Sequence, residues 1–414
     1  MEQKHVVIVG AGIVGAATAI WLRRAGVEVT LLDKGEPGMG ASYGNGGILA
    51  SCAVVPVTTP GLLTKGPGYL LDPSFPLFLR WRYLPKLAPW LTRYLSHANE
   101  MDTRRIAQGL THVIGDSLEQ HQALTSGTEA AKWVQPSDYS FAYRNRAAYE
   151  ADNFVWKLRE EAGFVPDLLE GAEVREREPI LSPDMGLLAV MKNHGYILNP
   201  AGYVKDLVAL LGQMGGKFVR AEVKDFDLSG GHIRAVETDQ GRIACDQAVL
   251  AAGVWSGPLM GKLGLKVPLE AERGYHIVFK GPSELPRSPM MLTSGKFVAT
   301  PMDHGLRCAG VVEFGGMTDR LSSAPLKLLR KKVAEVFPSL TATEEEEWMG
   351  FRPAPSDSLP LIGELRNTGV FTAFGHHHIG LTGGPKTGRM VADLITGTPT
   401  NADTRPYTPM RFSR

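Results

Sequence analysis

The stretch 6-VVIVGAGIVGAATA-19 decides the expected fold, because it joins a strand, a glycine turn and a helix. Val6 to Val9 is a short apolar run, and Ile13 to Ala25 has helical spacing that ends at Gly26. A second β-rich run, Val27 to Leu32, follows directly. This order predicts a βαβ unit and a parallel sheet.

The glycines of this stretch have the spacing of a dinucleotide site. Gly10 permits the tight turn, Gly12 lets a pyrophosphate approach the backbone, and Gly15 lets helix and strand pack closely. Asp33 ends the second strand, where its carboxylate can accept hydrogen bonds from ribose hydroxyls. A glycine turn without a ligand is the alternative, which the complete order of elements disfavours. The motif predicts one dinucleotide and does not distinguish NAD from FAD.

Composition excludes several classes of protein. The chain has 414 residues, enough for two or three domains, and 44 basic against 43 acidic residues. The net charge of +1 provides no field that would attract nucleic acid, so any membrane contact must be local. Cys52, Cys245 and Cys308 are far apart and odd in number, which favours a reducing cytoplasm over a disulfide scaffold. The polar start Met1 to His5 predicts neither a signal peptide nor a membrane span.

Two kinds of region alternate along the chain. Residues 100 to 162 are expected to be mostly helical, and 199 to 216 form a helix with Asn199 as N-cap. Strand candidates are 217–226, 232–238 and 243–253, and the pattern beyond Leu265 is β-rich. A strand at 370–374 precedes a final helix from about Pro385 to Ile395. One domain is therefore expected to be assembled from separated segments.

Four blocks resemble a known family. They are the βαβ start, 41-ASYGNGGIL-49, 248-AVLAAGVWS-256, and 350-GFRPAPSDSLPLIG-363 leading into 374-FGHHHIGLTGGPKTG-388. In order and spacing they resemble the FAD-dependent D-amino-acid oxidase superfamily over nearly the full length. D-amino-acid dehydrogenases and glycine or sarcosine oxidases belong to it, and the Asn-Gly-Gly block is most similar to the dehydrogenases.

The resemblance implies an α/β fold with two domains. A Rossmann-like FAD-binding domain would be assembled from 1–55, 199–262 and 349–414. The segments 56–198 and 263–348 would form a substrate domain with a mixed or antiparallel sheet and helices.

The resemblance also implies residues that hold FAD. The backbone of Ile13 and Val14 would contact the pyrophosphate, Asp33 and Lys34 the adenosine ribose, and Val223 the adenine. A solvated loop is the alternative for 41–49. The remaining implied cofactor contacts are Ala41, Ser42, Gly46, Gly47, Ile48, Ala252, Gly253, Trp255, Gly380, Leu381, Thr382 and Lys386, the last at a helix start that would stabilise reduced flavin.

For the substrate, the resemblance implies that Arg352 binds the carboxylate, a task for which its planar fork is suited. A structural ion pair with Asp357 is the alternative. Tyr275, His276 and Glu313 lie on strands that resemble the sheet over the flavin, and only alternate residues of a strand can face the pocket. Glu313 would bind the substrate ammonium unless it is paired elsewhere.

Three adjacent histidines, His376 to His378, raise the question of a metal site. Successive residues of an extended segment point to opposite sides, so the three side chains do not converge easily on one ion. No metal is therefore expected. His378 matches a position at which the family places a substrate-facing residue.

The implied reaction is oxidative deamination of a D-amino acid by hydride transfer from the α-carbon to flavin N5. Cyclic substrates such as D-proline or 4-hydroxy-D-proline are included. The alternatives are glycine or sarcosine oxidation, a flavoprotein subunit of a hetero-oligomeric dehydrogenase, and an NAD-dependent dehydrogenase. The electron acceptor is oxygen, a quinone or a partner subunit. Segment 75–97 is expected to cap the site, with peripheral contact to the inner face of the membrane as the alternative.

Overall fold

A computed structural model describes residues 4–400 and 402–413. Met1 to Gln3, part of the polar start discussed above, lie outside the described residues. Six strands form the first sheet, in the order β18-β19-β12-β1-β2-β8, and all neighbours pair in parallel except β18 with β19. They are β1 (His5–Val9), β2 (Glu28–Asp33), β8 (Lys217–Arg220), β12 (Gln247–Leu250), β18 (Leu361–Glu364) and β19 (Val370–Phe374). The predicted α/β class is confirmed.

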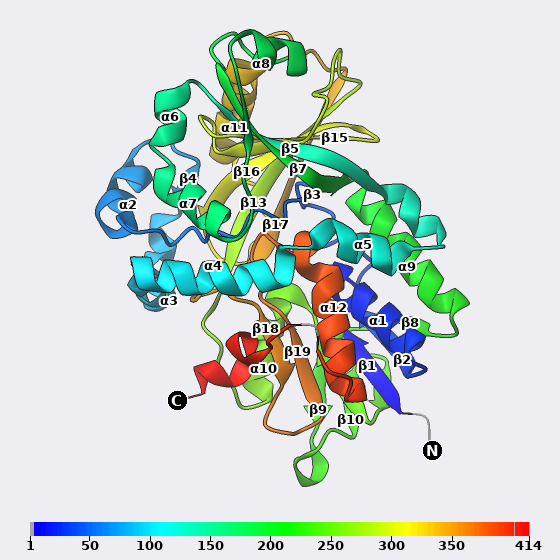
Figure 1. The fold of residues 1–414 in the computed structure, drawn as a ribbon. Helices are drawn as coiled ribbons and strands as arrows, with labels where there is room; N and C mark the ends of the chain where they lie inside the picture. The colour runs from blue at the N-terminus through cyan, green and yellow to red at the C-terminus, as the bar shows by residue number, and fades with distance from the viewer. Residues whose placement is uncertain (1–3, 401, 414) are drawn as a thin grey trace.

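Both faces of the first sheet are covered, which explains why β1 is apolar from Val6 to Val9. Val6 and Ile8 pack into one core with three helices, whereas Val7 and Val9 pack into the core on the other face. The three helices are α1 (Ile13–Arg24), α9 (Pro200–Gln213) and α12 (Gly380–Thr396), and Figure 1 shows α1 and α12 side by side against this sheet. The opposite face carries α10 (Ser256–Lys262) and a small sheet of β9 (Val223–Asp227), β10 (Ala235–Thr238) and β11 (Gly241–Ala244).

A second, ten-stranded sheet lies above the first in Figure 1. Its main path is β17-β13-β16-β15-β14-β5-β7-β3, with β4 beside β16 and β6 beside β7. Two pairs, β14 with β5 and β16 with β4, are parallel and the others antiparallel, so the predicted mixed sheet is confirmed. The strands are β3 (Ile48–Leu49), β4 (Leu77–Leu79), β5 (Val134–Tyr143), β6 (Asp167–Glu170), β7 (Leu187–Ile197), β13 (Leu269–Lys280), β14 (Met290–Leu292), β15 (Phe297–Met302), β16 (Gly305–Phe314) and β17 (Glu344–Pro355).

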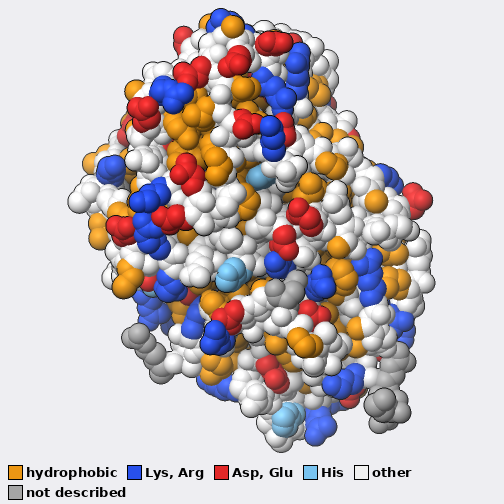
Figure 2. All heavy atoms as spheres, viewed as in Figure 1, with side chains coloured by type: hydrophobic (Ala, Val, Ile, Leu, Met, Phe, Trp, Pro, Cys, Tyr) orange, Lys and Arg blue, Asp and Glu red, His pale blue; other side chains and the backbone are white. Residues whose placement is uncertain are grey.

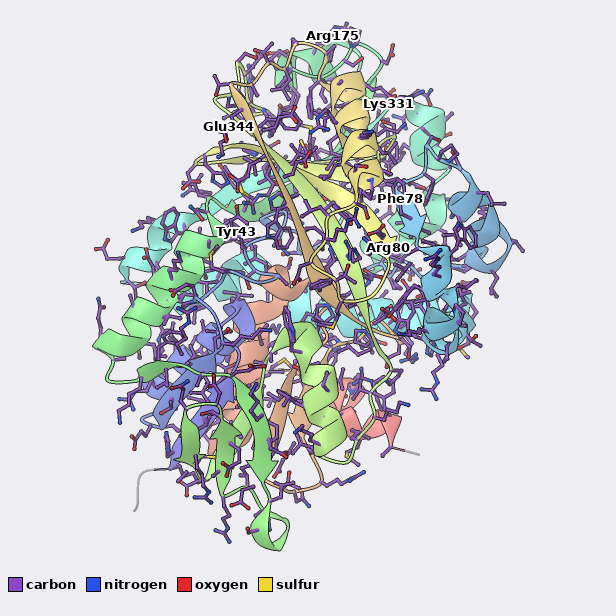
Figure 3. The ribbon with its side chains drawn as sticks, turned by 180° about the vertical axis from the view of Figure 1, so that it is seen from behind. Tyr43, Phe78, Arg80, Arg175, Lys331 and Glu344 are labelled. Carbon is purple, nitrogen blue, oxygen red and sulfur yellow. The ribbon has the colours of Figure 1, made fainter. Side chains whose placement is uncertain are left out.

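Helices surround this second sheet. α11 packs on β13 and β16, and α2 and α3 approach from the side of β4 (Figure 1). In the rear view of Figure 3, Phe78 and Arg80 mark the segment that runs alongside β16. The helices are α2 (Leu62–Leu71), α3 (Leu84–Ser96), α4 (Glu100–Ile114), α5 (Ser117–Thr125), α6 (Arg146–Glu150), α7 (Asn153–Glu161), α8 (Ala172–Arg177) and α11 (Ser323–Val336).

The structure differs from the predicted elements in three places. Region 100–162 contains a long strand, β5, whose aromatic side chains pack with α7 and β7 in the core of the second sheet. The predicted strands 217–226 and 243–253 are each split, because the chain passes from the first sheet to the small sheet between β8 and β9 and returns between β11 and β12. The last helix begins at Gly380 rather than near Pro385.

The division into two domains stays a prediction, and sheet membership agrees with most of it. β3 and residues 349–355 of β17 lie in segments assigned to the FAD-binding domain, yet they pair within the second sheet. Figure 2 shows acidic and basic side chains interspersed over one face, as expected from the balanced composition. Among the described residues, none of the helices combines the length and apolar character needed to cross a bilayer.

Candidate active site

A cavity of about 1750 Å³ lies where the two sheets meet. The carboxyl ends of β1, β2, β12 and β19 open into it, which is where ligands bind in open parallel sheets. Its volume exceeds the roughly 300–1,000 Å³ of a pocket for one drug-sized molecule. The cavity therefore has room for a dinucleotide together with a small substrate.

The glycine turn is shaped as the spacing predicts. Gly10 has φ +110°, and a Cβ on Gly15 would lie 1.9 Å from the Gly10 carbonyl oxygen, so helix and strand can approach only with glycine there. Asp33 accepts hydrogen bonds from the backbone N–H groups of Ala11 (2.8 Å) and Gly35 (2.9 Å). Its carboxylate thus holds the turn, and each oxygen retains a second lone pair for a ribose hydroxyl.

One predicted phosphate contact is already occupied. The backbone N–H of Ile13 donates to Ser42 Oγ at 3.0 Å, so a phosphate contact at Ile13 would compete with Ser42. Close by, the Lys34 ammonium lies over the Trp255 ring, 4.3 Å from its centroid. The predicted cofactor residues that line the cavity are Gly10, Gly12, Ile13, Val14, Asp33, Lys34, Ala41, Ser42, Gly46, Ile48, Val223, Ala252, Gly253, Trp255, Gly380, Leu381 and Thr382.

Three predicted cofactor residues lie away from the cavity wall, and one of them, Gly15, packs against Gly10 instead. Gly47 takes φ +79° and faces β15, where a Cβ would lie 2.5 Å from Met302 Cε. Lys386 lies in the second turn of α12, and its ammonium pairs with Asp116 at 2.8 Å. The prediction that Lys386 stands at a helix start beside the flavin is therefore corrected, because that helix starts at Gly380.

The loop before Gly47 is held from the second sheet, which sequence reasoning missed. Arg307 donates to the carbonyl oxygens of Tyr43 (2.6 Å) and Asn45 (2.9 Å). The carbonyl of Gly44 lies 3.2 Å from His276 Nδ1, and the carbonyl of Gly46 accepts a hydrogen bond from Thr300. Four successive carbonyls thus face the second sheet. No sequence motif marks these donors, since they come from three different strands.

Arg307 is fully buried, and among the described residues it has no carboxylate at ion-pair distance. Burial lowers the pKa of its guanidinium to about 10, so it remains charged at neutral pH. The two loop carbonyls and the Tyr43 ring, 5.2 Å from the guanidinium carbon, provide its compensation. Burial of the Arg307 charge is unfavourable, which indicates that the protein needs the loop to be held in this position.

The first turn of α12 faces the cavity and has an unusual partner. Pro385 has no N–H to donate to the carbonyl of Leu381, four residues earlier. His121, fully buried, donates from Nε2 to that carbonyl at 2.9 Å, and its Nδ1 accepts from the Tyr203 hydroxyl at 2.9 Å. Burial lowers the pKa of His121 to about 4, which keeps it neutral for this role.

Because the His121 side chain replaces the missing backbone N–H of Pro385, mutations of His121 and Pro385 should have coupled effects on stability. His121→Ala leaves the Leu381 carbonyl buried without a donor and should lower the free energy of unfolding by roughly 1–3 kcal/mol. In a Pro385→Ala background the helix regains a backbone N–H, so the same change should cost about 1 kcal/mol less. Urea unfolding of the four proteins measures the coupling. Equal costs in both backgrounds would contradict the assignment.

Arg352 on β17 places its positively charged guanidinium in the wall of the cavity. Among the described residues, its guanidinium forms no hydrogen bond or ion pair within 4 Å, although it lines the cavity. Gly274 on β13 makes room for it, since a Cβ there would lie 2.7 Å from Arg352 Nε. The alternative of a structural pair with Asp357 is wrong, because Arg411 holds that carboxylate at 2.6 Å.

Three predicted substrate residues lie outside the cavity. Glu313 accepts from the Tyr275 hydroxyl at 2.7 Å and pairs with Arg273 at 2.7 Å and Arg80, so it is not available to a substrate ammonium. Tyr275 faces away from the cavity, because its neighbour Gly274 faces toward it. His276 is covered by Trp348, whose ring is stacked on it at 5.0 Å. The predicted substrate contacts of Tyr275, His276 and Glu313 are thus corrected.

Glu272, and not Glu313, is the glutamate that lines the cavity. It lies on the same face of β13 as Gly274, is 4 % exposed and lines the cavity. Its carboxylate lies 2.8 Å from His377 Nε2. Burial alone would raise the pKa of Glu272, but His377 and Arg352 outweigh burial and lower it, so the carboxylate is ionised.

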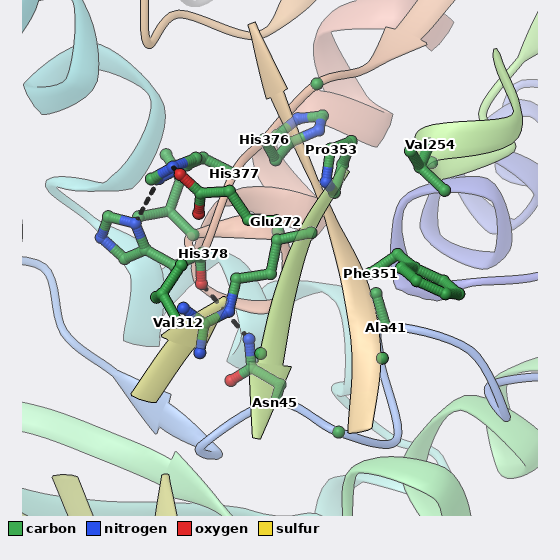
Figure 4. A pocket seen from close by; sticks show the side chains of 18 of the residues that line it. Ala41, Asn45, Val254, Glu272, Val312, Phe351, Pro353, His376, His377 and His378 are labelled. Atoms are coloured by element: carbon green, nitrogen blue, oxygen red, sulfur yellow. Dashed lines mark hydrogen bonds and ion pairs between the residues drawn. The ribbon is translucent and has the colours of Figure 1, made fainter. Parts of the chain in front are cut away.

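The three histidines do not alternate as expected for an extended segment. His377 takes a left-handed conformation, φ +52°, which brings its ring and that of His378 to the same side, 4.8 Å apart. His376 points elsewhere, with Nε2 2.9 Å from Thr387 Oγ1. Figure 4 shows His377 between Glu272 and His378. In the part of the chain that the structure describes, no group of three or more His, Cys, Asp or Glu side chains is arranged to bind a metal.

Comparison with known proteins agrees with this geometry. The family model described as FAD dependent oxidoreductase matches residues 5–394. The chain belongs to this family of FAD-dependent oxidoreductases. A D-amino-acid oxidase of Bradyrhizobium diazoefficiens is 39% identical, covering 99% of each chain, and a D-amino acid dehydrogenase of Rhizobium rhizogenes is 28% identical, covering 98% of this chain and 99% of the relative. The crystal structure of a glycine oxidase from Geobacillus kaustophilus superposes with a TM-score of 0.75 at 20% identity, over 99% of each chain.

The cavity fits the cofactor of a FAD-dependent oxidoreductase. The glycine turn leaves the space that a pyrophosphate needs, and the small residues Ala41, Ser42, Gly44 and Gly46 line the cavity, where a planar ring could approach the backbone. Thr382 Oγ1 donates to the carbonyl of Ile48 at 3.2 Å, which joins the two loops predicted to hold the ring. FAD bound in this cavity would supply the redox chemistry, and the residues of the chain would position the substrate.

Proposed function

We propose that this FAD-dependent oxidoreductase removes a hydride from the α-carbon of a D-amino acid, with a cyclic D-imino acid such as D-proline or 4-hydroxy-D-proline among its substrates. The unpaired guanidinium of Arg352 carries the proposal. It is a planar, bidentate donor inside a cavity whose other end has the shape of a dinucleotide site. A carboxylate is the group that this donor binds best, and the relatives named for D-amino acids support the hand of the substrate.

The proposed pocket has one polar side and one apolar side. Arg352 would bind the carboxylate, and His378 lies exposed in the cavity nearby. The apolar side comes from segment 75–97 and β16, which supports the proposal that this segment caps the cavity. An apolar wall suits a substrate side chain larger than the hydrogen of glycine. The lining residues of this wall are Leu77, Leu79, Leu87, Leu91, Val312 and Phe314.

The acceptor of the electrons is a separate part of the proposal. Val57, Leu63, Leu71 and Trp81 are exposed around the cap, with Lys65 and Arg82 close in sequence. Such a basic and apolar rim suits peripheral contact with an anionic membrane, where a quinone would be the acceptor. Oxygen consumption by the purified protein, compared with reduction of a soluble quinone analogue, separates the two acceptors. Rapid oxygen consumption would reject the quinone proposal.

Product analysis tests the reaction. The purified protein is incubated with an electron-accepting dye and a panel of D-amino acids, D-proline, 4-hydroxy-D-proline, glycine and sarcosine. Acyclic D-amino acids should yield the keto acid and ammonia in equal amounts, and the cyclic substrates a cyclic imine without ammonia. If glycine and sarcosine alone react, the protein is a glycine or sarcosine oxidase. If no compound reacts until a second chain is added, it is a subunit of a larger dehydrogenase.

A further inference from the structure

Three side chains in contact, Glu272, His377 and His378, lie along the wall of the cavity. The Glu272 carboxylate lies 2.8 Å from His377 Nε2, and His377 Nδ1 lies 2.6 Å from His378 Nδ1. The Nε2 atom of His378 has no hydrogen-bond partner among the described residues, and its side chain is exposed in the cavity. Figure 4 shows the three side chains in this order.

When His377 is neutral, the ionised Glu272 and the two distances decide which nitrogens carry hydrogen. Glu272 is ionised, so the nitrogen facing it, His377 Nε2, must carry a hydrogen, although this N–H is bent away from a linear hydrogen bond and the attraction is largely Coulombic. A neutral His377 then has a lone pair on Nδ1. His378 must donate its Nδ1–H across the 2.6 Å contact. The remaining lone pair of His378 is therefore on Nε2, which is available as a base.

We propose that Glu272, His377 and His378 form a relay that accepts the proton of the substrate ammonium. The proposal rests on the proposed function, because an amino acid enters as an ammonium and only the neutral amine has the lone pair that drives loss of the α-hydride. The N–H bond of the substrate breaks and a bond to His378 Nε2 forms. The Nδ1 proton of His378 moves to His377 Nδ1, and no electron leaves the substrate in this step.

The relay ends in a stable arrangement. The cavity walls surround the His378 ring although it is open to the cavity, and this desolvation, with the nearby Arg352 cation, holds the pKa of His378 well below its usual value, so His378 passes the proton on. His377, protonated on both nitrogens, then faces the Glu272 carboxylate as an ion pair inside the protein. The other groups facing the pair are Arg352, which would be neutralised by the substrate carboxylate, Tyr94, whose pKa is raised by burial and by Glu272 so that it stays neutral, and Glu270, whose pKa is raised by burial and by the charge of Glu272.

The backbone supports a functional reading of His377. A left-handed conformation is uncommon for histidine, and such strain gathers at functional sites. The conformation is fixed on both sides, since His377 N–H donates to the carbonyl of Pro353, next to Arg352, and Asn45 Nδ2 donates to the carbonyl of His378 at 3.3 Å. The backbone hydrogen bond between His377 and Pro353 thus connects the relay to the strand that carries Arg352.

Stopped-flow reduction of the flavin by a D-amino acid, measured anaerobically from about pH 6.5 to about pH 10, tests the relay. Glu272→Gln should slow reduction about 100-fold near neutral pH, the size expected for a lost general base. The rate should return to within about threefold of wild type above the pKa of the substrate ammonium, where the free amine binds directly. His377→Asn, which tolerates the left-handed conformation, should behave alike.

Glu270→Gln is the matched control. Glu270 is a buried glutamate on the same strand and face, but it accepts from the Tyr83 hydroxyl at 2.9 Å and does not line the cavity. It should follow the wild-type pH profile. Reduction of Glu272→Gln at the wild-type rate near neutral pH, or an equal loss at every pH, would overturn the relay alone. A wild-type flavin that no amino acid reduces would overturn the proposed function and the relay with it.

Discussion

Replacing Arg352 with methionine is expected to lower kcat/KM for a D-amino acid about 1,000-fold. Two charge-assisted hydrogen bonds to the substrate carboxylate, each worth roughly 2 kcal/mol, would be lost. Arg352→Lys keeps the charge but not the planar fork and should recover only part of the activity. Steady-state kinetics of both variants, with flavin content measured alongside, gives the comparison.

Arg411→Met is the control for this experiment. Arg411 binds Asp357, a few residues beyond Arg352, and does not line the cavity. Its loss should lower stability while leaving KM for the substrate near that of wild type. An Arg352→Met variant with unchanged KM and kcat would show that Arg352 does not bind the substrate.

The second large effect is expected for the cofactor. Arg307→Met removes the donor shared by the Tyr43 and Asn45 carbonyls and leaves both groups buried. At roughly 1–3 kcal/mol for each unsatisfied group, affinity for FAD should fall about 100-fold. Titration of the apoprotein with FAD, followed by quenching of flavin fluorescence, measures the affinity directly.

Arg330→Met provides the comparison for Arg307. Arg330 lies on α11 and pairs with Glu345 and Glu347 at the surface. Its removal should leave FAD affinity unchanged, since exposed pairs contribute little. If the Arg307 and Arg330 variants bind FAD equally well, the loop does not need its donors.

The sequence was most informative where function depends on backbone shape. Gly10, Gly12 and Gly15 are separated by fixed intervals because a turn, a close approach and a helix packing contact succeed one another within a few residues. The position of Asp33 beside the glycine turn follows from the length of the same strand, turn, helix and strand unit. Such local relations can be predicted, and the structure places these residues as expected.

Relations between distant segments could not be predicted in the same way. Glu272 and Glu313 lie on neighbouring strands, and only the side on which β13 places its residues decides which of them faces the cavity. Arg307 reaches a loop some 260 positions earlier, as its bonds to Tyr43 and Asn45 show. The left-handed turn at His377 also reversed the expected direction of one ring. These outcomes depend on packing, which no local pattern records.

The most direct test of the central claim is an anaerobic titration of the purified yellow protein with both hands of one amino acid. The D form should remove the absorbance of oxidised flavin at about 450 nm, with one substrate consumed for each flavin reduced. The L form should leave the absorbance unchanged. Bleaching by the L form alone, or by neither form of any amino acid tried, would show that the protein does not oxidise D-amino acids.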